Sequence, residues 1–490
     1  MAGIGFELRR ILAEDTYSSM VKGYLYATVI SAGPWLLSVL CLGALGIFTI
    51  SFMGFADRQL FASTMVYVYA ASLLGTGVSQ LIITRFLADK LYQGETAALC
   101  ESLLPVMVVT LATQLPLAII GLWGTPLPFG YRLATSATFL VISLIWQTMT
   151  FISASRDYAV IVFSFAIGAG VSVAGGLLWG RQYGVVGYMM GFGLGQFCIL
   201  ALLLTKVLRE FGMPTRLEWG FLRYAGKYPQ LVGIGLFYNA SIWVDKILFG
   251  LSQYGRLTAE RFPTYTHYDS SMFLAFAAMA PAMAIFLART ETEFADAYKH
   301  YYDDIFFRRP YDRILRSKAA MLGILKRSFV DLVKIQGLVT LLLVYFADDI
   351  LKALSLPYSQ TAIFRFALIG AFLQVLMLFI HIVLLYFDLR GTVLGLTLLF
   401  FVANAALTAL SIALGFTYYG AGFAVAAAFS LLCTTLYLYG RLADLEFITF
   451  ARRKIVGQQG ARRRDRARPG GMYGRYLPCP GDDKRLAPRR

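Results

Sequence analysis

Two adjacent charges, Asp245 and Lys246, interrupt the apolar stretch "SIWVDKILFG" at 241–250. A charged side chain at the centre of a membrane helix costs about 2.5–3.5 kcal/mol on insertion scales, so charges placed there usually serve a function. Neighbouring side chains on a helix point about 100° apart, so we expect these two charges not to form a simple local pair. Each then needs its own partner, water or headgroup.

The stripe that carries Lys246 along a helix also carries Asn239 and Trp243. An amide, an indole face and a cation suit a sugar site, because aromatic faces stack on sugar rings and polar tips bind hydroxyls. Three interpretations stay open: a functional pair facing a cavity, a lysine that snorkels to the nearby outer headgroups, or a structural ion pair with another helix.

Other apolar segments contain polar or helix-breaking residues. Gln374 and His381 share one helix face at i and i+7, and His381 is a candidate proton carrier. Gly33-Pro34 and Pro281 interrupt two apolar runs. Such breaks release backbone carbonyls that can line a cavity or act as hinges in transporters.

Four charges lie where apolar runs end, at positions suited to a cytoplasmic gate. Arg85 in "QLIITRFLAD" and Arg289 in "MAIFLARTET" each precede an acid at the end of the second helix of a half, which is a faint internal repeat. Asp388 and Arg390 bracket a short turn, where a salt bridge would close the same end.

The motifs of known enzymes and metal sites do not match. The stretch "GFLRYAGKY" at 220–228 has the wrong spacing for a phosphate-binding loop. The three histidines are far apart in sequence, and the five cysteines form no CxxC pair. We therefore expect no metal, no cofactor and no enzymatic activity.

The composition defines the elements that must position these residues. The chain is 58% hydrophobic and only 15% charged, against roughly 25% charged in soluble domains. Its long apolar runs suit a hydrocarbon layer about 30 Å thick, in which helix is the only plausible state for such runs. The sequence predicts about twelve transmembrane helices, at 24–50, 60–84, 103–123, 131–151, 158–180, 184–206, 228–251, 268–289, 330–347, 361–388, 391–416 and 419–440.

Lysine and arginine are concentrated in alternate loops along the whole chain. By the positive-inside rule this alternation predicts a membrane protein with both termini in the cytoplasm. The net charge of +16 is then a property of topology, and nucleic-acid binding is not expected.

Loop lengths divide the chain into two six-helix lobes. The loop at 290–329 alternates basic and apolar residues, which suits a helix on the anionic inner leaflet or a docking surface for a cytoplasmic partner. The predicted regions are a cytoplasmic amphipathic segment at 1–23, an N-lobe at 24–206, a linker at 207–227, a C-lobe at 228–440 and a basic, largely disordered cytoplasmic tail at 441–490.

Several stretches resemble the PelG family, the inner-membrane transporters of Pel exopolysaccharide systems. They are "MAGIGFELRRIL" at the start, "SAGPWLLSVL" (31–40), "TRFLADKLY" (84–92), "IWVDKILFG" (242–250) and "YFDLRG" (386–391), and the resemblance covers roughly residues 1–455. It implies the superfamily of multidrug, oligosaccharidyl-lipid and polysaccharide flippases, in which two six-helix lobes surround a central cavity. It also implies export of a polymer rich in galactosamine and N-acetylgalactosamine.

The resemblance further implies partners: other Pel inner-membrane proteins and a cytoplasmic glycosyltransferase, besides membrane lipids. Two alternatives to polymer transport remain. In the first, the chain is a membrane scaffold that anchors the glycosyltransferase and transports nothing itself. In the second, it is either a flippase for a lipid-linked oligosaccharide or an ion-coupled exporter.

Overall fold

The computed structural model describes residues 33, 37, 38, 40–50, 53–155, 158–258, 262–354 and 356–443. The predicted N-terminal segment 1–23 and nearly all of the predicted tail 441–490 lie outside these residues. The chain divides into Met1–Thr435 and a small second unit, Leu436–Arg490. The first unit carries all the sites considered below.

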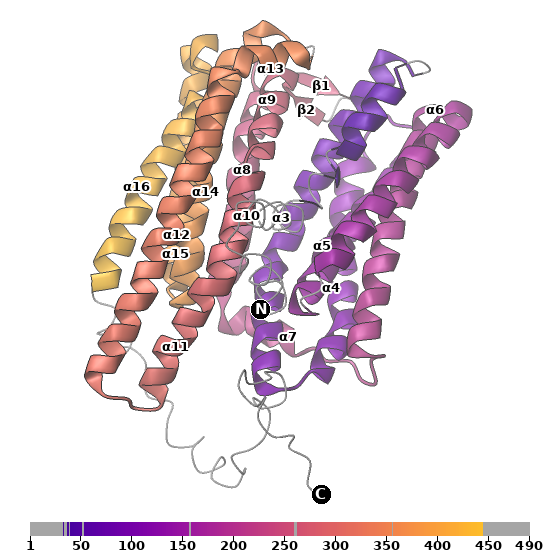
Figure 1. Ribbon diagram of the computed structural model, residues 1–490. Helices are drawn as coiled ribbons and strands as arrows, with labels where there is room; N and C mark the ends of the chain where they lie inside the picture. The colour runs from indigo at the N-terminus through magenta and orange to yellow at the C-terminus, as the bar shows by residue number, and fades with distance from the viewer. Residues whose placement is uncertain are drawn as a thin grey trace, which may run out of the picture. The chain divides into compact units, whose positions relative to one another are not determined.

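Four long helices form the N-terminal half of the first unit. They are α3 (Phe55–Gln93), α4 (Ala97–Leu122), α5 (Phe129–Ser155) and α6 (Tyr158–Phe211). α6 turns back on itself at Gly184, whose φ of 59° is accessible to glycine at little cost. Gly175 then lies against Gly191 across the two arms. The arms are the two helices predicted at 158–180 and 184–206 (Figure 1).

The C-terminal half follows a short amphipathic helix, α7 (Gly220–Lys227). It contains one antiparallel two-stranded hairpin, in which Leu257 faces Pro263. Its elements are α8 (Pro229–Leu251), β1 (Arg256–Thr258), β2 (Phe262–Thr264), α9 (Thr266–Ala277), α10 (Ala280–Ala288), the π-helical turn Arg289–Phe294, α11 (Ala295–Phe306), α12 (Tyr311–Tyr345), α13 (Ala347–Ala353), α14 (Thr361–Tyr386), α15 (Arg390–Leu414) and α16 (Ala421–Ala443).

Over the described residues, nine helices are long and apolar enough to cross a membrane. α6 counts once among them although it holds two predicted spans, and α9 with α10 is a further predicted span that is broken in the middle. About half of the predicted first span, 24–50, lies outside the described residues. The prediction of an all-α polytopic membrane protein is confirmed, and the number twelve is confirmed only in part.

The buried apolar side chains gather separately in the two halves. Two clusters are built mainly from α3–α6, around Phe86 and Phe192, and a third is built from α8, α9 and α13–α16, around Phe249 and Phe423. Many side chains at the other surface of α4, such as Leu104 and Ile120, are exposed, as expected for a face that contacts lipid. The halves are therefore two lobes, each with its own core.

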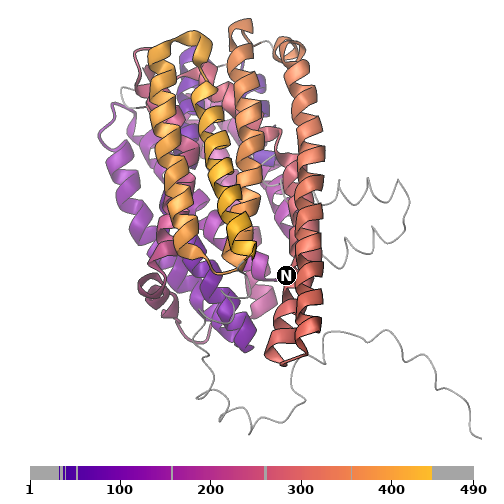
Figure 2. The same cartoon turned by 90° about the vertical axis from the view of Figure 1, so that its left-hand side faces the viewer.

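The structure differs from the sequence prediction in the region 290–329. Residues 311–329 are not a separate surface helix, because α12 is one continuous helix of 35 residues. No proline interrupts it, and its buried side chains, from Ile314 to Thr340, follow one stripe along its whole length. The basic half of α12 therefore continues along the axis of the apolar half (Figure 2).

The two lobes meet along α3 and α8. Gly77 on α3 and Gly235 on α8 allow the two backbones to touch, since a Cβ on Gly235 would collide with the Gly77 carbonyl. Asn239 lies against the same point of α3 and donates to the Gly235 carbonyl at 2.8 Å. Small residues at such a crossing are typical of membrane helices, which associate through close packing.

Gly235→Ala should therefore lower the thermal stability of the purified chain, by about 1–3 kcal/mol for an overpacked contact. Gly121→Ala on α4 is the matched control, because no atom stands within 4 Å of a Cβ added there. The control should be neutral or slightly stabilising, since alanine favours helix over glycine by about 0.5–1 kcal/mol. Equal melting temperatures for the two variants would contradict the close crossing.

Candidate functional site

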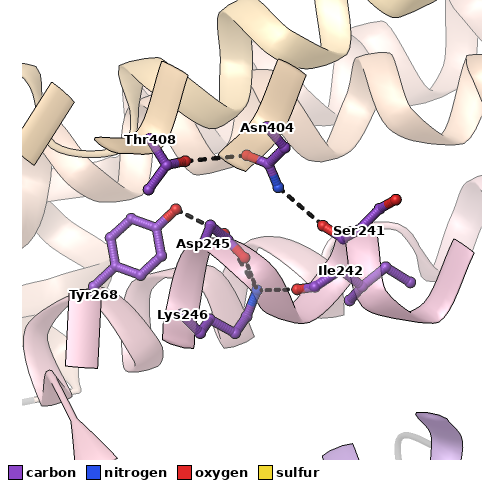
Figure 3. A network of polar contacts seen from close by, with 7 residues as sticks. All are labelled: Ser241, Ile242, Asp245, Lys246, Tyr268, Asn404 and Thr408. Carbon is purple, nitrogen blue, oxygen red and sulfur yellow. Dashed lines mark hydrogen bonds and ion pairs between the residues drawn. The ribbon is translucent and has the colours of Figure 1, made fainter. Parts of the chain in front are cut away.

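The α8 charge pair, Asp245 and Lys246, is buried within the C-lobe (Figure 3). The Lys246 Nζ lies 3.2 Å from Asp245 Oδ1, and the Tyr268 hydroxyl of α9 donates to Asp245 Oδ2 at 2.7 Å. Asp245 is 1% exposed and Tyr268 is fully buried. Lys246 also lies over the rings of Trp243, at 5.7 Å, and Phe276, at 5.0 Å. The cation is thus held by a carboxylate and two aromatic faces.

This geometry corrects the expectation that the two charges do not form a local pair. The argument from adjacent positions considered only the directions of the Cβ atoms, whereas the lysine stem is long enough to bend. Lys246 turns back along its own helix, and its Nζ donates to the Ile242 carbonyl at 2.7 Å. It therefore points away from the nearer end of α8 at Leu251, which is the opposite of snorkelling towards that end.

A second carboxylate stands near the pair. Asp269, in the first turn of α9, is close enough to interact electrostatically with Lys246 and Asp245. Its Oδ2 accepts the Tyr265 N–H at 3.2 Å. One ammonium group therefore serves two carboxylates, and the cluster carries a net negative charge when all three groups are ionised.

An amide of α15 holds the adjoining turn of α8. Asn404 is fully buried and donates through Nδ2 to the Ser241 carbonyl at 2.9 Å, while its Oδ1 accepts the Thr408 hydroxyl at 3.1 Å (Figure 3). The Ser241 carbonyl is one turn from Asp245. α15 thus fixes the part of α8 that carries the charge pair.

The other predicted path residues are not gathered in one place. Trp243 contacts Lys246, but Asn239 faces Gly77 on the other lobe. On α14, His381 and Gln374 are both buried, and among the described residues neither the His381 Nε2 nor the Gln374 Oε1 has a hydrogen-bond partner.

Pro281 is the second residue of α10 and follows the break at residues 278–279 between α9 and α10. A glutamine bridges that break. The Gln336 Nε2 on α12 donates to the Ala278 carbonyl at 2.8 Å, and its Oε1 accepts the Ala282 N–H at 3.1 Å. These two backbone groups would bond to each other in an unbroken helix. The Gln336 side chain is therefore inserted into the series of backbone hydrogen bonds that runs along the helix. Of the other predicted hinge, Gly33 is buried and Pro34 lies outside the described residues.

Three of the four predicted gate charges lie around one tyrosine. Tyr228, at the start of α8, has the Arg390 guanidinium at 4.3 Å from its ring centre and the Arg85 guanidinium at 5.8 Å. Arg390 pairs with Asp388 at 2.9 Å. This Tyr228 cluster joins α3 of the N-lobe to α15 of the C-lobe.

Arg289 is not part of the Tyr228 cluster. It pairs with Glu293 at 2.5 Å and with Asp331 of α12 at 3.3 Å, both within the C-lobe. The faint sequence repeat between Arg85 and Arg289 therefore does not bring the two arginines together.

At the opposite end of α3, the β1–β2 hairpin of the C-lobe lies on the N-lobe. The Tyr67 hydroxyl donates to the Pro263 carbonyl, and the Ser63 and Thr258 hydroxyls lie 3.4 Å apart. Phe262 is buried in the N-lobe core beside Tyr67. The lobes therefore touch at both ends of α3 as well as at its middle.

Sequence reasoning missed Tyr268, Asn404, Gln336 and Tyr228. Asn404 and Gln336 were visible as single amides in apolar runs, "FVANAAL" and "VKIQGLV". In lipid such an amide needs a partner from another helix, but the sequence alone does not tell which helix supplies it.

The fold is that of the superfamily that includes the multidrug MATE transporters. An outward-facing MATE transporter of the MOP superfamily matches with a TM-score of 0.60 at 14% identity, over 87% of this chain and 96% of that chain. A MOP transporter from Pyrococcus furiosus, whose binding pocket has reversed polarity, matches at 0.59 and 13%, over 87% and 96%. A MATE structure in the straight conformation matches at 0.60 and 13%, over 86% and 96%. Among curated proteins, none matches in sequence.

Within that class of membrane transporter, the family is set by the sequence. The model of the PelG family, described as "Putative exopolysaccharide Exporter (EPS-E)", matches residues 1–450. The chain belongs to this family.

Gln336→Leu should destabilise the chain by about 2–4 kcal/mol, because it leaves a buried N–H and a buried carbonyl at the Pro281 break without partners. Gln374→Leu is the matched control, since it removes a buried amide whose Oε1 bonds to no described residue. Thermal unfolding of the purified variants measures both. Equal losses would contradict the repair of the ladder by Gln336.

Tyr228→Leu should loosen the contact between α3 and α15, whereas Tyr228→Phe should keep it, because two cation–π contacts together contribute about 1–3 kcal/mol. Thermal unfolding of the purified variants measures the change, and Tyr228→Leu should melt at a lower temperature than Tyr228→Phe. Equal melting temperatures for the two variants would mean that the ring does not hold the lobes.

Proposed function

We propose that this membrane transporter moves the Pel exopolysaccharide, a polymer rich in galactosamine and N-acetylgalactosamine, from the cytoplasm to the periplasm. The polymer passes between the two lobes, through a central cavity that opens alternately to each side. The family assignment supports a polysaccharide cargo, and the two-lobed MOP fold supports alternating access. The chain itself catalyses no reaction and hydrolyses no ATP.

The observation that carries the proposal is the α8 charge pair. α8 is the helix at which the lobes meet, since it packs on α3 of the N-lobe and on α15 of the C-lobe. Buried charges in membrane helices mark substrate and ion pathways more often than they serve stability. The second carboxylate beside the pair, Asp269 of α9, suits a polymer whose deacetylated amino sugars are cationic.

The proposed orientation places both termini and the Tyr228 cluster on the cytoplasmic side of the inner membrane. The excess of lysine and arginine in alternate loops supports it. In this orientation the Tyr228 cluster closes the cytoplasmic end of the α3–α8 contact, and the β1–β2 hairpin closes the periplasmic end. The partners are other Pel inner-membrane proteins and the cytoplasmic glycosyltransferase that makes the polymer.

Changing one charge of the pair tests its role poorly, because a lone buried charge costs about 3–5 kcal/mol and destabilises the chain by itself. The Asp245→Asn, Lys246→Met variant removes both charges and keeps an acceptor for the Tyr268 hydroxyl. It also carries Asp269→Asn, so that no lone carboxylate is left beside the pair. We expect this variant to reach the membrane at normal levels and to reduce Pel secretion at least tenfold.

Asp349→Asn with Lys352→Met is the matched control for the charge pair, because it makes the same two changes at exposed positions of α13. It should secrete normally. Full secretion from the Asp245→Asn, Lys246→Met variant would remove the pair from the path and leave it a structural role.

A further inference from the structure

α11 and the first half of α12 form a helical hairpin with an internal brace (Figures 1 and 2). Asp304 accepts the Ser317 hydroxyl and pairs with the Arg313 Nε at 3.0 Å. The hydrogen bond from the Ser317 hydroxyl, and to a smaller extent the charge of Arg313, lower the pKa of the Asp304 carboxyl, so this carboxylate stays ionised. Tyr301 of α11 is fully buried. The hairpin is therefore held as a unit.

The turn at the hairpin tip has a fixed backbone. The Phe307 N–H bonds to the Asp303 carbonyl and the Arg309 N–H to the Asp304 carbonyl, both at 2.9 Å. Between them Arg308 adopts a φ of 51°, in the left-handed region that favours glycine. An arginine at a position that suits glycine indicates that its side chain is retained for a purpose other than local stability.

The tip exposes aromatic rings among basic side chains. Phe306, Phe307 and Tyr311 are 69%, 63% and 57% exposed. Arg308 and Arg309 are exposed beside them. Large aromatic side chains next to arginine are the residue types that dominate binding energy at protein interfaces.

The length of α12 excludes the lipid surface as the occupant. α12 has 35 residues, or about 52 Å, and a hydrocarbon layer about 30 Å thick takes up about 20 of them, counted back from Tyr345. About 15 residues, or about 22 Å, remain between that layer and the start of the helix at Tyr311. The headgroup layer on each side of a bilayer is only about 5–7 Å thick, so the tip stands clear of it.

We propose that the tip formed by residues 306–311 is a docking surface for a cytoplasmic protein that presents an apolar pocket with an acidic rim. The inference rests on the orientation and function proposed above. The rest of the chain does not supply this chemistry: residues 444–490 are strongly basic, and the tip of a second copy carries the same charge. Exposed arginines steer and orient an acidic partner, while the phenylalanines supply the contact energy.

The test places a photo-crosslinking benzoyl-phenylalanine at Phe307 in the full chain, in cells that secrete the polymer. The same probe at Tyr345, 75% exposed at the other end of α12, is the control. We expect a protein adduct at Phe307 only, with one defined acidic cytoplasmic protein or domain. The adduct should persist in the double variant Arg308→Lys with Arg309→Lys. It should fall at least tenfold in the double variant Arg308→Glu with Arg309→Glu. In that second variant it should return when acids of the partner's rim are changed to lysine.

A lipid adduct at Phe307, no adduct, or an adduct that is indifferent to the Arg308→Glu, Arg309→Glu reversal would each overturn the proposal. The transport path is judged separately. The Asp245→Asn, Lys246→Met variant should lose secretion and keep the adduct, whereas the reversed tip should lose both at an unchanged membrane level. If the charge-pair variant secretes normally while the tip behaves as expected, the path assignment fails and the docking surface stands.

Discussion

The constraint that organises this protein is that a backbone N–H or carbonyl in the hydrocarbon layer has no water to bond. Helical hydrogen bonds satisfy most of these groups, and side chains from other helices bond to two places that need more. At the Pro281 break, Gln336 of another helix supplies both the donor and the acceptor that the ladder lacks. At the Ser241 carbonyl, Asn404 does the same from α15. Polar side chains in the spans therefore repair and fix the backbone at selected points.

Buried charges need partners for the same reason, and the free-energy cost of leaving them without partners is larger. Lys246 has a carboxylate, a carbonyl and two aromatic faces around its ammonium group, so the cost of burying it is offset locally. Tyr268 holds the carboxylate from the other side. A cluster that satisfies itself within one lobe does not need the opposite lobe to stay buried. It can therefore remain intact while the lobes move apart.

Much of the fold could be predicted from the sequence, because long apolar runs leave helix as the only option and basic loops alternate. The two lobes and the place of the charge pair on a membrane-spanning helix followed from these patterns. The details that depend on which helices meet did not. The local Asp245–Lys246 pair depends on how a flexible lysine stem bends, and the partner of Gln336 depends on packing between segments more than 50 residues apart. The continuity of α12 was missed because a basic stretch beside an apolar one looks like two elements, although no helix-breaking proline separates them.

The continuity of α12 has a mechanical consequence. The same helix carries the exposed tip at Tyr311 and the repaired break at Gln336, 25 residues or about 37 Å apart. A helix without a proline is a stiff rod over this distance. A rotation of about 10° around the break would carry the tip through about 6 Å, and a force on the tip would act on the broken helix with the same lever arm. A partner that binds the tip would thus have a mechanical connection to the interior of the C-lobe.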